Sequence, residues 1–121
     1  MTNNSELFLN MLEDDLLYAQ FRVDYFDLDF ARTSLKQRQE FVGNKKIKLL
    51  ADLSLVKKVT KEARDFMGSE PAYEGIVAAC LIVSSPLTAM FGNFYMRMAA
   101  NVVPTKLVVS KEEGIKWLKD K

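Results

Sequence analysis

Several carboxylates stand near the expected ends of strands, where the side chains of an acid–base site could gather. They are Asp24, Asp27, Asp29, Asp52 and Glu74. Two carboxyl groups can carry out glycoside hydrolysis or proton transfer when burial separates their pKa values. These five stand beside turn and helix-cap signals, where an acidic side chain stabilises local structure. They therefore give catalysis little support.

The sequence lacks most other groups on which catalysis depends. It contains no histidine, and Cys80 is its only cysteine. These counts exclude His-dependent triads, a structural zinc site and an intramolecular disulfide bond. We also find no glycine-rich phosphate loop, no metal-ligand spacing and no activated serine motif. We expect a binding or scaffolding domain that is not an enzyme and that holds neither a metal nor a cofactor.

The charge is balanced, with 17 Lys or Arg, 16 Asp or Glu and a net charge of +1. This balance argues against nucleic-acid binding. The two parts of the chain differ, because residues 1–44 carry a net charge of −4 and residues 45–121 a net charge of +5. We interpret this division as an ordinary solvated surface, with an electrically two-faced molecule as the alternative.

Targeting signals are absent from the sequence pattern. The first eight residues, MTNNSELF, are polar and lack the basic and apolar regions of a signal peptide. The longest fully apolar run, Ile76 to Val83, is too short to span a bilayer. We expect a cytoplasmic protein of a reducing compartment, without a transmembrane segment.

The first half of the chain predicts a β-hairpin, a helix, a strand and a second helix. Two apolar segments, 6–12 and 16–21, form the hairpin. Asp27 is an N-cap signal for a helix over 28–42, which Gly43 ends. Residues 46–52 alternate as a strand does, and Thr60 then opens a helix over 60–68.

The second half predicts two further strand–helix pairs. The run 75–83 is apolar on both faces, as in a central strand, so Cys80 within it is expected to be a small buried side chain. Ser85 and Pro86 begin a helix that runs to about residue 100. A strand over 105–110 precedes a terminal helix, for which Ser110 and Glu113 match a capping box.

These elements predict an α/β fold in which an N-terminal β-hairpin is followed by βαβαβα, with a largely parallel sheet and four helices. We expect one domain over residues 1–121, without repeats or a linker. The strands should contribute Leu49, Ala51, Val77, Ala79, Leu81, Leu107 and Val109 to the core. The helices should contribute Leu35, Phe66, Leu87, Phe94 and Leu118.

This order of elements, with the tract LLADLSLVKKVTKEARDF over residues 49–66, resembles the STAS domain and its relatives that are similar to sporulation protein AA. In that family a strand ends in Asp-Leu-Ser, as at residues 52–54 here, and an Asp-Ser-Ser-Gly-Leu tract begins the next helix. One of the serines is phosphorylated by a partner kinase that is also an anti-sigma factor. The resemblance implies a regulatory domain that acts by binding other proteins.

The phosphorylation tract differs in this sequence. The resemblance places Thr60 at the family's aspartate, Lys61 at the first serine and Glu62 at the usual phosphoacceptor. Glu62 in the first turn stabilises the helix through the helix dipole, and the alternative is that it imitates a phosphoserine. We expect that the phosphoserine switch is lost, with Thr60 and Ser54 as the remaining, unfavoured acceptors.

The second half also resembles a group of small STAS-like proteins of uncharacterised function, known chiefly from Bacteroidetes. This resemblance supports the fold and implies no activity. It rests on Ser84, Pro86, Gly92, Asn93, Phe94, Pro104, Thr105, Lys106, Trp117 and Leu118.

The predicted helix over 86–100 offers a candidate interaction face. At about 100° per residue, one arc of it is apolar and is expected to face the sheet. That arc holds Leu87, Met90, Phe91, Phe94 and Met98. The opposite arc is almost uncharged, and it holds Ala89, Gly92, Asn93, Met96 and Ala100, with Arg97 as the single charge of the segment.

We expect this opposite arc to contact a second copy of the chain in a homodimer. Other occupants remain open: another regulatory protein, an element of the same monomer, or an apolar small molecule. The resemblance implies the last of these, because some relatives of sporulation protein AA are thought to bind lipids.

Overall fold

A six-stranded sheet forms the centre of the molecule. The computed structural model describes residues 2–3, 6–84, 88–90, 92–93, 96 and 103–121. Within these residues the strands are β1 (Thr2–Asn3), β2 (Leu7–Glu13), β3 (Leu16–Phe21), β4 (Tyr25–Phe26), β5 (Ile47–Asp52), β6 (Lys58–Val59), β7 (Ile76–Ile82) and β8 (Thr105–Val108). The sheet has the order β1-β2-β3-β5-β7-β8, and β4 pairs separately with β6. The pairs β1–β2 and β2–β3 are antiparallel, whereas β3, β5, β7 and β8 run parallel to one another.

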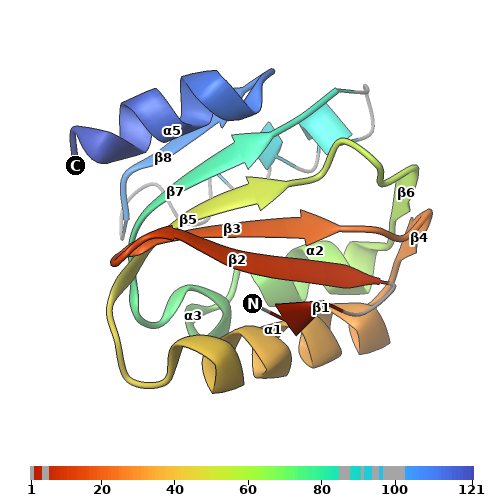
Figure 1. Cartoon of the computed structure of the whole chain (residues 1–121). Coiled ribbons are helices and arrows are strands. Elements are labelled where there is room, and N and C mark those ends of the chain that lie inside the picture. The colour runs from red at the N-terminus through yellow and green to blue at the C-terminus, as the bar shows by residue number, and fades with distance from the viewer. Residues whose placement is uncertain (1, 4–5, 85–87, 91, 94–95, 97–102) are drawn as a thin grey trace.

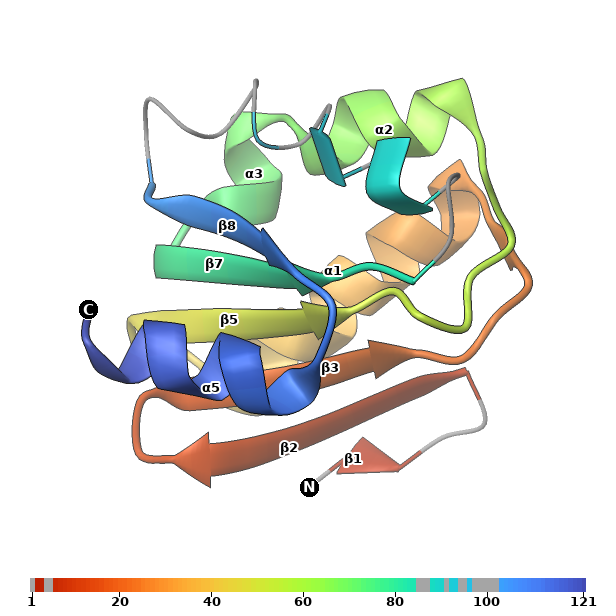
Figure 2. The same cartoon turned by 90° about the horizontal axis from the view of Figure 1, so that it is seen from above.

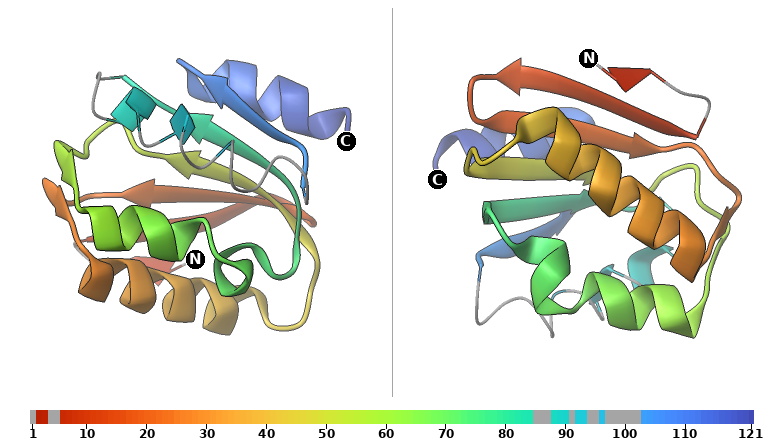
Figure 3. Two further views of the ribbon diagram at one scale, coloured as in Figure 1. Left: turned by 180° about the vertical axis from the view of Figure 1, so that it is seen from behind. Right: turned by 90° about the horizontal axis from the view of Figure 1, so that it is seen from below.

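Helices cover both faces of this sheet. They are α1 (Leu28–Val42), α2 (Lys61–Met67), α3 (Glu70–Tyr73) and α5 (Lys111–Lys119). The first three lie on one face and α5 lies on the other (Figures 1 and 2). In the view from behind, α1 and α2 run side by side beneath the strands, which agrees with the contacts between them (Figure 3).

The helix boundaries follow local chemistry. The carboxylate of Asp27 accepts a hydrogen bond from the backbone N–H of Phe30 at 2.9 Å, and the Thr60 hydroxyl accepts one from that of Ala63 at 3.1 Å. Gly43 ends α1 with a φ of 66°, a conformation in which glycine is strongly favoured. These caps satisfy N–H groups that a helix leaves without partners, which is why both helices begin where the sequence predicts.

Buried side chains form two clusters, one on each side of the sheet. The larger lies between the sheet and α1, α2 and α3, and includes Ala31, Ala63 and Ala72. The smaller lies beneath α5 and includes Leu118 and Cys80. Because the fully buried side chains of α1, α2 and α3 are small, these helices lie close to the strands.

The predicted α/β fold with its largely parallel sheet is confirmed. The hairpin, both helices of the first half, the central strand and the terminal helix are present. Four elements were not predicted: β1, β4, β6 and α3. They have two to four residues each, too few for a periodic pattern to reveal.

The predicted core is confirmed at Leu35, Leu49, Ala51, Ala79, Leu81 and Leu118, which are buried. It is wrong at Val77, because the pairing of β5 with β7 shifts register there and leaves Val77 as an extra, outward-facing residue. It is also wrong at Val109, which lies beyond the end of β8. Leu107 and Phe66 are partly buried against the core, and Leu87 and Phe94 lie outside the described residues.

The predicted orientation of the helix over 86–100 is wrong at two positions. Gly92 is buried, and a Cβ atom there would collide with the Leu107 side chain and lie 3.4 Å from that of Val83. Met90, which was expected to face the sheet, is exposed. Small residues here permit close contact with the sheet, so the glycine lies inward and the methionine outward.

Candidate functional site

The carboxyl ends of four parallel strands meet at one edge of the sheet, and we call this the carboxyl edge. Because β3, β5, β7 and β8 are mutually parallel, the segments that follow them leave the sheet on the same side. Ligands and partners of open α/β sheets commonly bind at this edge. The Asp-Leu-Ser tract and the start of α2 both lie there, so the sequence-predicted switch positions belong to it.

Asp52, the last residue of β5, is buried and serves the local structure. One of its carboxylate oxygens accepts a hydrogen bond from the Tyr18 hydroxyl at 2.5 Å, and the other accepts one from the backbone N–H of Ser54 at 2.9 Å. Burial, together with the neighbouring Asp52 carboxylate, raises the pKa of Tyr18. Asp52 therefore ties β5 to β3 and shapes the turn after β5.

That turn leads the chain to the start of α2. Leu53 and Val56 point into the core, whereas Leu55 between them is exposed. The backbone N–H of Thr60 then donates to the carbonyl of Phe26 at 3.0 Å, which joins the short β4–β6 pair to the helix. The position of the α2 N-terminus is thus fixed by buried leucine and valine side chains and by β4.

The three switch-equivalent residues have different surroundings. Thr60 uses its hydroxyl as the N-cap, and Lys61 forms an exposed ion pair with Asp65 at 3.2 Å. Glu62 is exposed in the first turn of α2. A shallow surface hollow of about 290 Å³ lies beside them, lined by Tyr25, Asp27, Leu28, Asp29, Thr60 and Glu62.

The five carboxylates singled out in the sequence do not form one site. Asp27 and Asp29 line the shallow hollow, whereas Asp52 lies within the sheet and accepts hydrogen bonds. Asp24 forms an exposed ion pair with Lys57, and Glu74 lies at the opposite edge, just before β7. Among the described residues no group of three acids or cysteines is placed to hold a metal ion.

Exposed apolar side chains lie in segments that follow the carboxyl ends of the parallel strands. They follow four parallel strands: Tyr25 (51% exposed) after β3, Leu55 (49%) after β5, Met90 (56%) after β7 and Val109 (77%) after β8. Of the large apolar residues exposed in the described part of the chain, only Val77 (44%) lies elsewhere, at the start of β7. No local pattern predicts this grouping, because the four residues are far apart in sequence.

The predicted interaction face is only partly at the surface. Ala89 is partly buried and packs against the larger core cluster, and Gly92 is buried. Asn93 is exposed and Met96 is half-buried. Arg97 and Ala100 lie outside the described residues.

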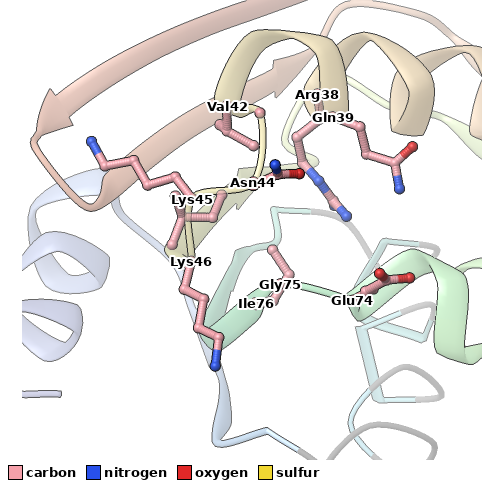
Figure 4. A pocket seen from close by; sticks show the side chains of 11 residues that line it. Arg38, Gln39, Val42, Asn44, Lys45, Lys46, Glu74, Gly75 and Ile76 are labelled. Carbon is pink, nitrogen blue, oxygen red and sulfur yellow. The ribbon is translucent and has the colours of Figure 1, made fainter.

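The part of the chain that the structure describes contains small internal voids and a larger surface hollow. Two apolar voids between the sheet and the α1–α2 layer have volumes of about 20 and 10 Å³, which is room for about one water molecule each. Another hollow, about 410 Å³, is more polar than apolar and lies at the amino edge of β5 and β7 (Figure 4). No helix in the described part of the chain has the length and apolar character to cross a membrane.

Comparisons with known proteins agree with this architecture. The structure is similar to that of an uncharacterised protein of the DUF3478 family from Shewanella loihica with a SpoIIAA-like fold, at a TM-score of 0.69 and 13% identity, covering 98% of each chain. It is also similar to a proposed anti-sigma factor antagonist from Thermotoga maritima, at a TM-score of 0.59 and 11% identity, covering 93% of this chain and 94% of that one. At such identities the likeness shows the fold alone, and the fold is STAS-like.

No curated protein matches the sequence. A family model described as a domain of unknown function, DUF7793, matches residues 10–121. The match begins within β2 and includes β3, the Asp52 turn, the start of α2 and the terminal helix. The chain therefore belongs to the DUF7793 family.

Proposed function

We propose that this chain is a non-catalytic, STAS-like interaction domain that associates with a second copy of itself through the carboxyl edge. The four exposed apolar side chains at this edge carry the proposal. We call them the apolar edge residues: Tyr25, Leu55, Met90 and Val109. The similar structure from Thermotoga maritima is that of a proposed anti-sigma factor antagonist, a description that implies a protein partner.

An aromatic residue, two large aliphatic residues and a methionine are suited to a protein contact. Aromatic residues and methionine are enriched in interfaces, and apolar groups gathered on one surface favour association. The apolar edge residues lie in segments that follow four neighbouring strands of the sheet, and on this basis we propose that one partner covers them together. A second copy is our first choice because two-fold dimers of one repeated surface are the commonest oligomers of soluble proteins.

The proposed domain works without the phosphoserine switch. Glu62 keeps a permanent negative charge where the family resemblance places the phosphoacceptor, and it is exposed. Thr60 is the neighbouring hydroxyl, and its oxygen already accepts the capping hydrogen bond from Ala63. Because Glu62 stands at the usual acceptor position and the Thr60 hydroxyl is explained by its capping role, a constitutive surface suits these residues better than a phosphorylation switch.

The absence of catalysis is part of the proposal. The sequence has no histidine. Asp52 and Asp27 accept structural hydrogen bonds, and Asp24 is ion-paired. Asp27, Asp29 and Glu62 line one shallow hollow, but Asp27 is engaged as the N-cap of α1, and Asp29 and Glu62 are exposed to solvent. The hollow therefore lacks the buried carboxyl group on which acid–base catalysis by paired acids depends.

Substitution of Leu55 by lysine tests the proposed surface. Sedimentation equilibrium would measure the mass of the wild type and of Leu55→Lys and Met90→Lys. We expect a dimer for the wild type and a folded monomer for each variant, because a lysine ammonium within an apolar contact loses its hydration. Val77→Lys is the matched control, since Val77 is similarly exposed but lies at the amino end of β7, and it should remain a dimer.

Circular dichroism would establish that each variant is folded. A wild-type monomer at all concentrations would contradict self-association. A dimer that survives both Leu55→Lys and Met90→Lys would show that the contact lies elsewhere, and loss of the dimer in Val77→Lys alone would place it at the opposite edge.

A further inference from the structure

The hollow at the amino edge lies at the opposite end of the sheet from the apolar edge residues. It is framed by the last turns of α1, the loop into β5 and the short connection from α3 into β7 (Figure 4). Its volume of about 410 Å³ falls within the usual range of small-molecule sites. The lining residues are Arg38, Gln39, Val42, Gly43, Asn44, Lys45, Lys46, Ile47, Glu74, Gly75 and Ile76.

Backbone geometry fixes the course of the two loops that frame this hollow. Gly43 and Gly75 have φ values of 66° and 81°, the left-handed region that favours glycine. The two loops that carry them are joined by a hydrogen bond from the backbone N–H of Ile47 to the carbonyl of Gly75, at 3.0 Å. A ligand would therefore enter a preformed site and would not have to order the loops.

The charges around the hollow are mainly positive. Arg38, Lys45 and Lys46 carry three positive charges, against the single carboxylate of Glu74. Arg38 is only 7% exposed, and its Nη2 donates to the Ala72 carbonyl at 2.6 Å, so the guanidinium is held in place. In the close-up this guanidinium points toward Gly75 and Glu74, while Lys45 and Lys46 extend outward from the rim (Figure 4).

We propose that the amino-edge hollow binds a small organic anion that carries more than one negative charge. The lysines at the rim provide a positive field that attracts such a ligand, and the fixed Arg38 guanidinium provides a donor inside. The amide side chains of Gln39 and Asn44 add groups that hydrogen-bond to hydroxyl or carboxyl oxygens. This site is independent of the proposed self-association, because it lies at the other edge of the sheet.

Citrate is a suitable probe, and glucose is a neutral probe of similar size. Both would be titrated into ¹⁵N-labelled full-length protein at constant ionic strength, with amide chemical shifts as the readout. We expect saturable shifts with citrate, concentrated in residues 43–47 and 74–76, and none with glucose. Citrate shifts that do not saturate, or that occur mainly at other residues, would overturn the proposal.

Paired lysine substitutions distinguish binding of citrate in the hollow from nonspecific association with surface lysines. Lys45→Gln with Lys46→Gln should weaken citrate binding about tenfold, because two attractive charges are lost from the rim. The matched control is Lys57→Gln with Lys58→Gln, which removes the same charge from two exposed neighbours at the carboxyl edge. This control should bind citrate within about twofold of the wild type.

Glu74→Gln is expected to change the citrate affinity in the opposite direction from the Lys45→Gln, Lys46→Gln pair. It removes the only carboxylate among the described residues that line the hollow, and it should tighten citrate binding severalfold. Unchanged citrate affinity in Glu74→Gln, or equal weakening by both lysine pairs, would show that citrate associates nonspecifically with the protein surface. Arg38 would then serve only the structure, through its hydrogen bond to the Ala72 carbonyl.

Discussion

Asp52 organises the carboxyl edge at the scale of single residues. Its two oxygens accept hydrogen bonds from a tyrosine hydroxyl on β3 and from a backbone N–H in the following turn. Gln20 adds a longer contact of 3.5 Å to the same carboxylate. A buried carboxylate needs such donors, because an ionised group without them is costly to bury.

Tyr18→Phe should therefore destabilise the fold by about 1–3 kcal/mol, because Asp52 loses a buried donor. Urea unfolding followed by circular dichroism would measure the change in unfolding free energy. Tyr25→Phe is the control: Tyr25 is exposed, and its variant should stay within about 0.5 kcal/mol of the wild type. Equal stability of the two variants would contradict the role assigned to the Tyr18–Asp52 bond.

The raised pKa of Tyr18 also predicts a pH dependence. In the unfolded chain this tyrosine ionises near the ordinary tyrosine pKa of 10.0, while in the folded protein it stays neutral to higher pH. The stability that this group contributes is therefore complete below about pH 10 and decreases as the pH rises above it. Urea midpoints of the wild type should fall faster between about pH 9 and pH 11 than those of Tyr18→Phe, and parallel curves would contradict this assignment.

Helix caps could be predicted from the sequence, whereas side-chain contacts between residues far apart in the chain could not. The caps at Asp27, Thr60 and Ser110 were predictable because each partner lies three residues away. Tyr18 and Arg38 were not recognised, since their partners lie 34 residues away along the chain. The residues of the switch tract could be named in advance, whereas their neighbours across the carboxyl edge could not.

At the scale of elements, glycines set how closely helices approach the sheet. Gly114 lies within α5, and a Cβ atom built on it would lie 2.5 Å from the Leu50 Cδ1 atom and 3.4 Å from the Cys80 sulfur. Gly92 is similarly close to Leu107. This explains why the arc of the 86–100 segment that looked suited to a partner packs inward at Gly92: hydrophobicity alone does not distinguish a small buried residue from a small exposed one.

Gly114→Ala should destabilise the protein by about 1–3 kcal/mol, as overpacking of a core does. In an ordinary helix interior the same substitution stabilises the protein by about 0.5–1 kcal/mol. The test is therefore whether Gly114→Ala lowers or raises the free energy of unfolding. Thermal or urea unfolding would measure it. Lys116→Ala, an exposed position of the same helix, serves as the control and should change stability by less than about 0.5 kcal/mol.

At the scale of the whole molecule, the two edges of the parallel sheet have different chemistry. The carboxyl edge carries the apolar edge residues and the start of α2 with Glu62. The amino edge carries the polar hollow with its three basic residues. The parallel direction of the strands was predictable from the alternation of strands and helices, but the exposure of Tyr25, Leu55, Met90 and Val109 follows only from the folded structure.

Hydrogen exchange at two protein concentrations, one below and one above the association range, tests the proposed contact edge most directly. The amides of residues 53–60 should exchange more slowly at the high concentration, while those of residues 43–47 and 74–76 at the amino edge should not change. Slower exchange at the amino edge, or rates that are the same at both concentrations throughout the chain, would contradict self-association through the carboxyl edge.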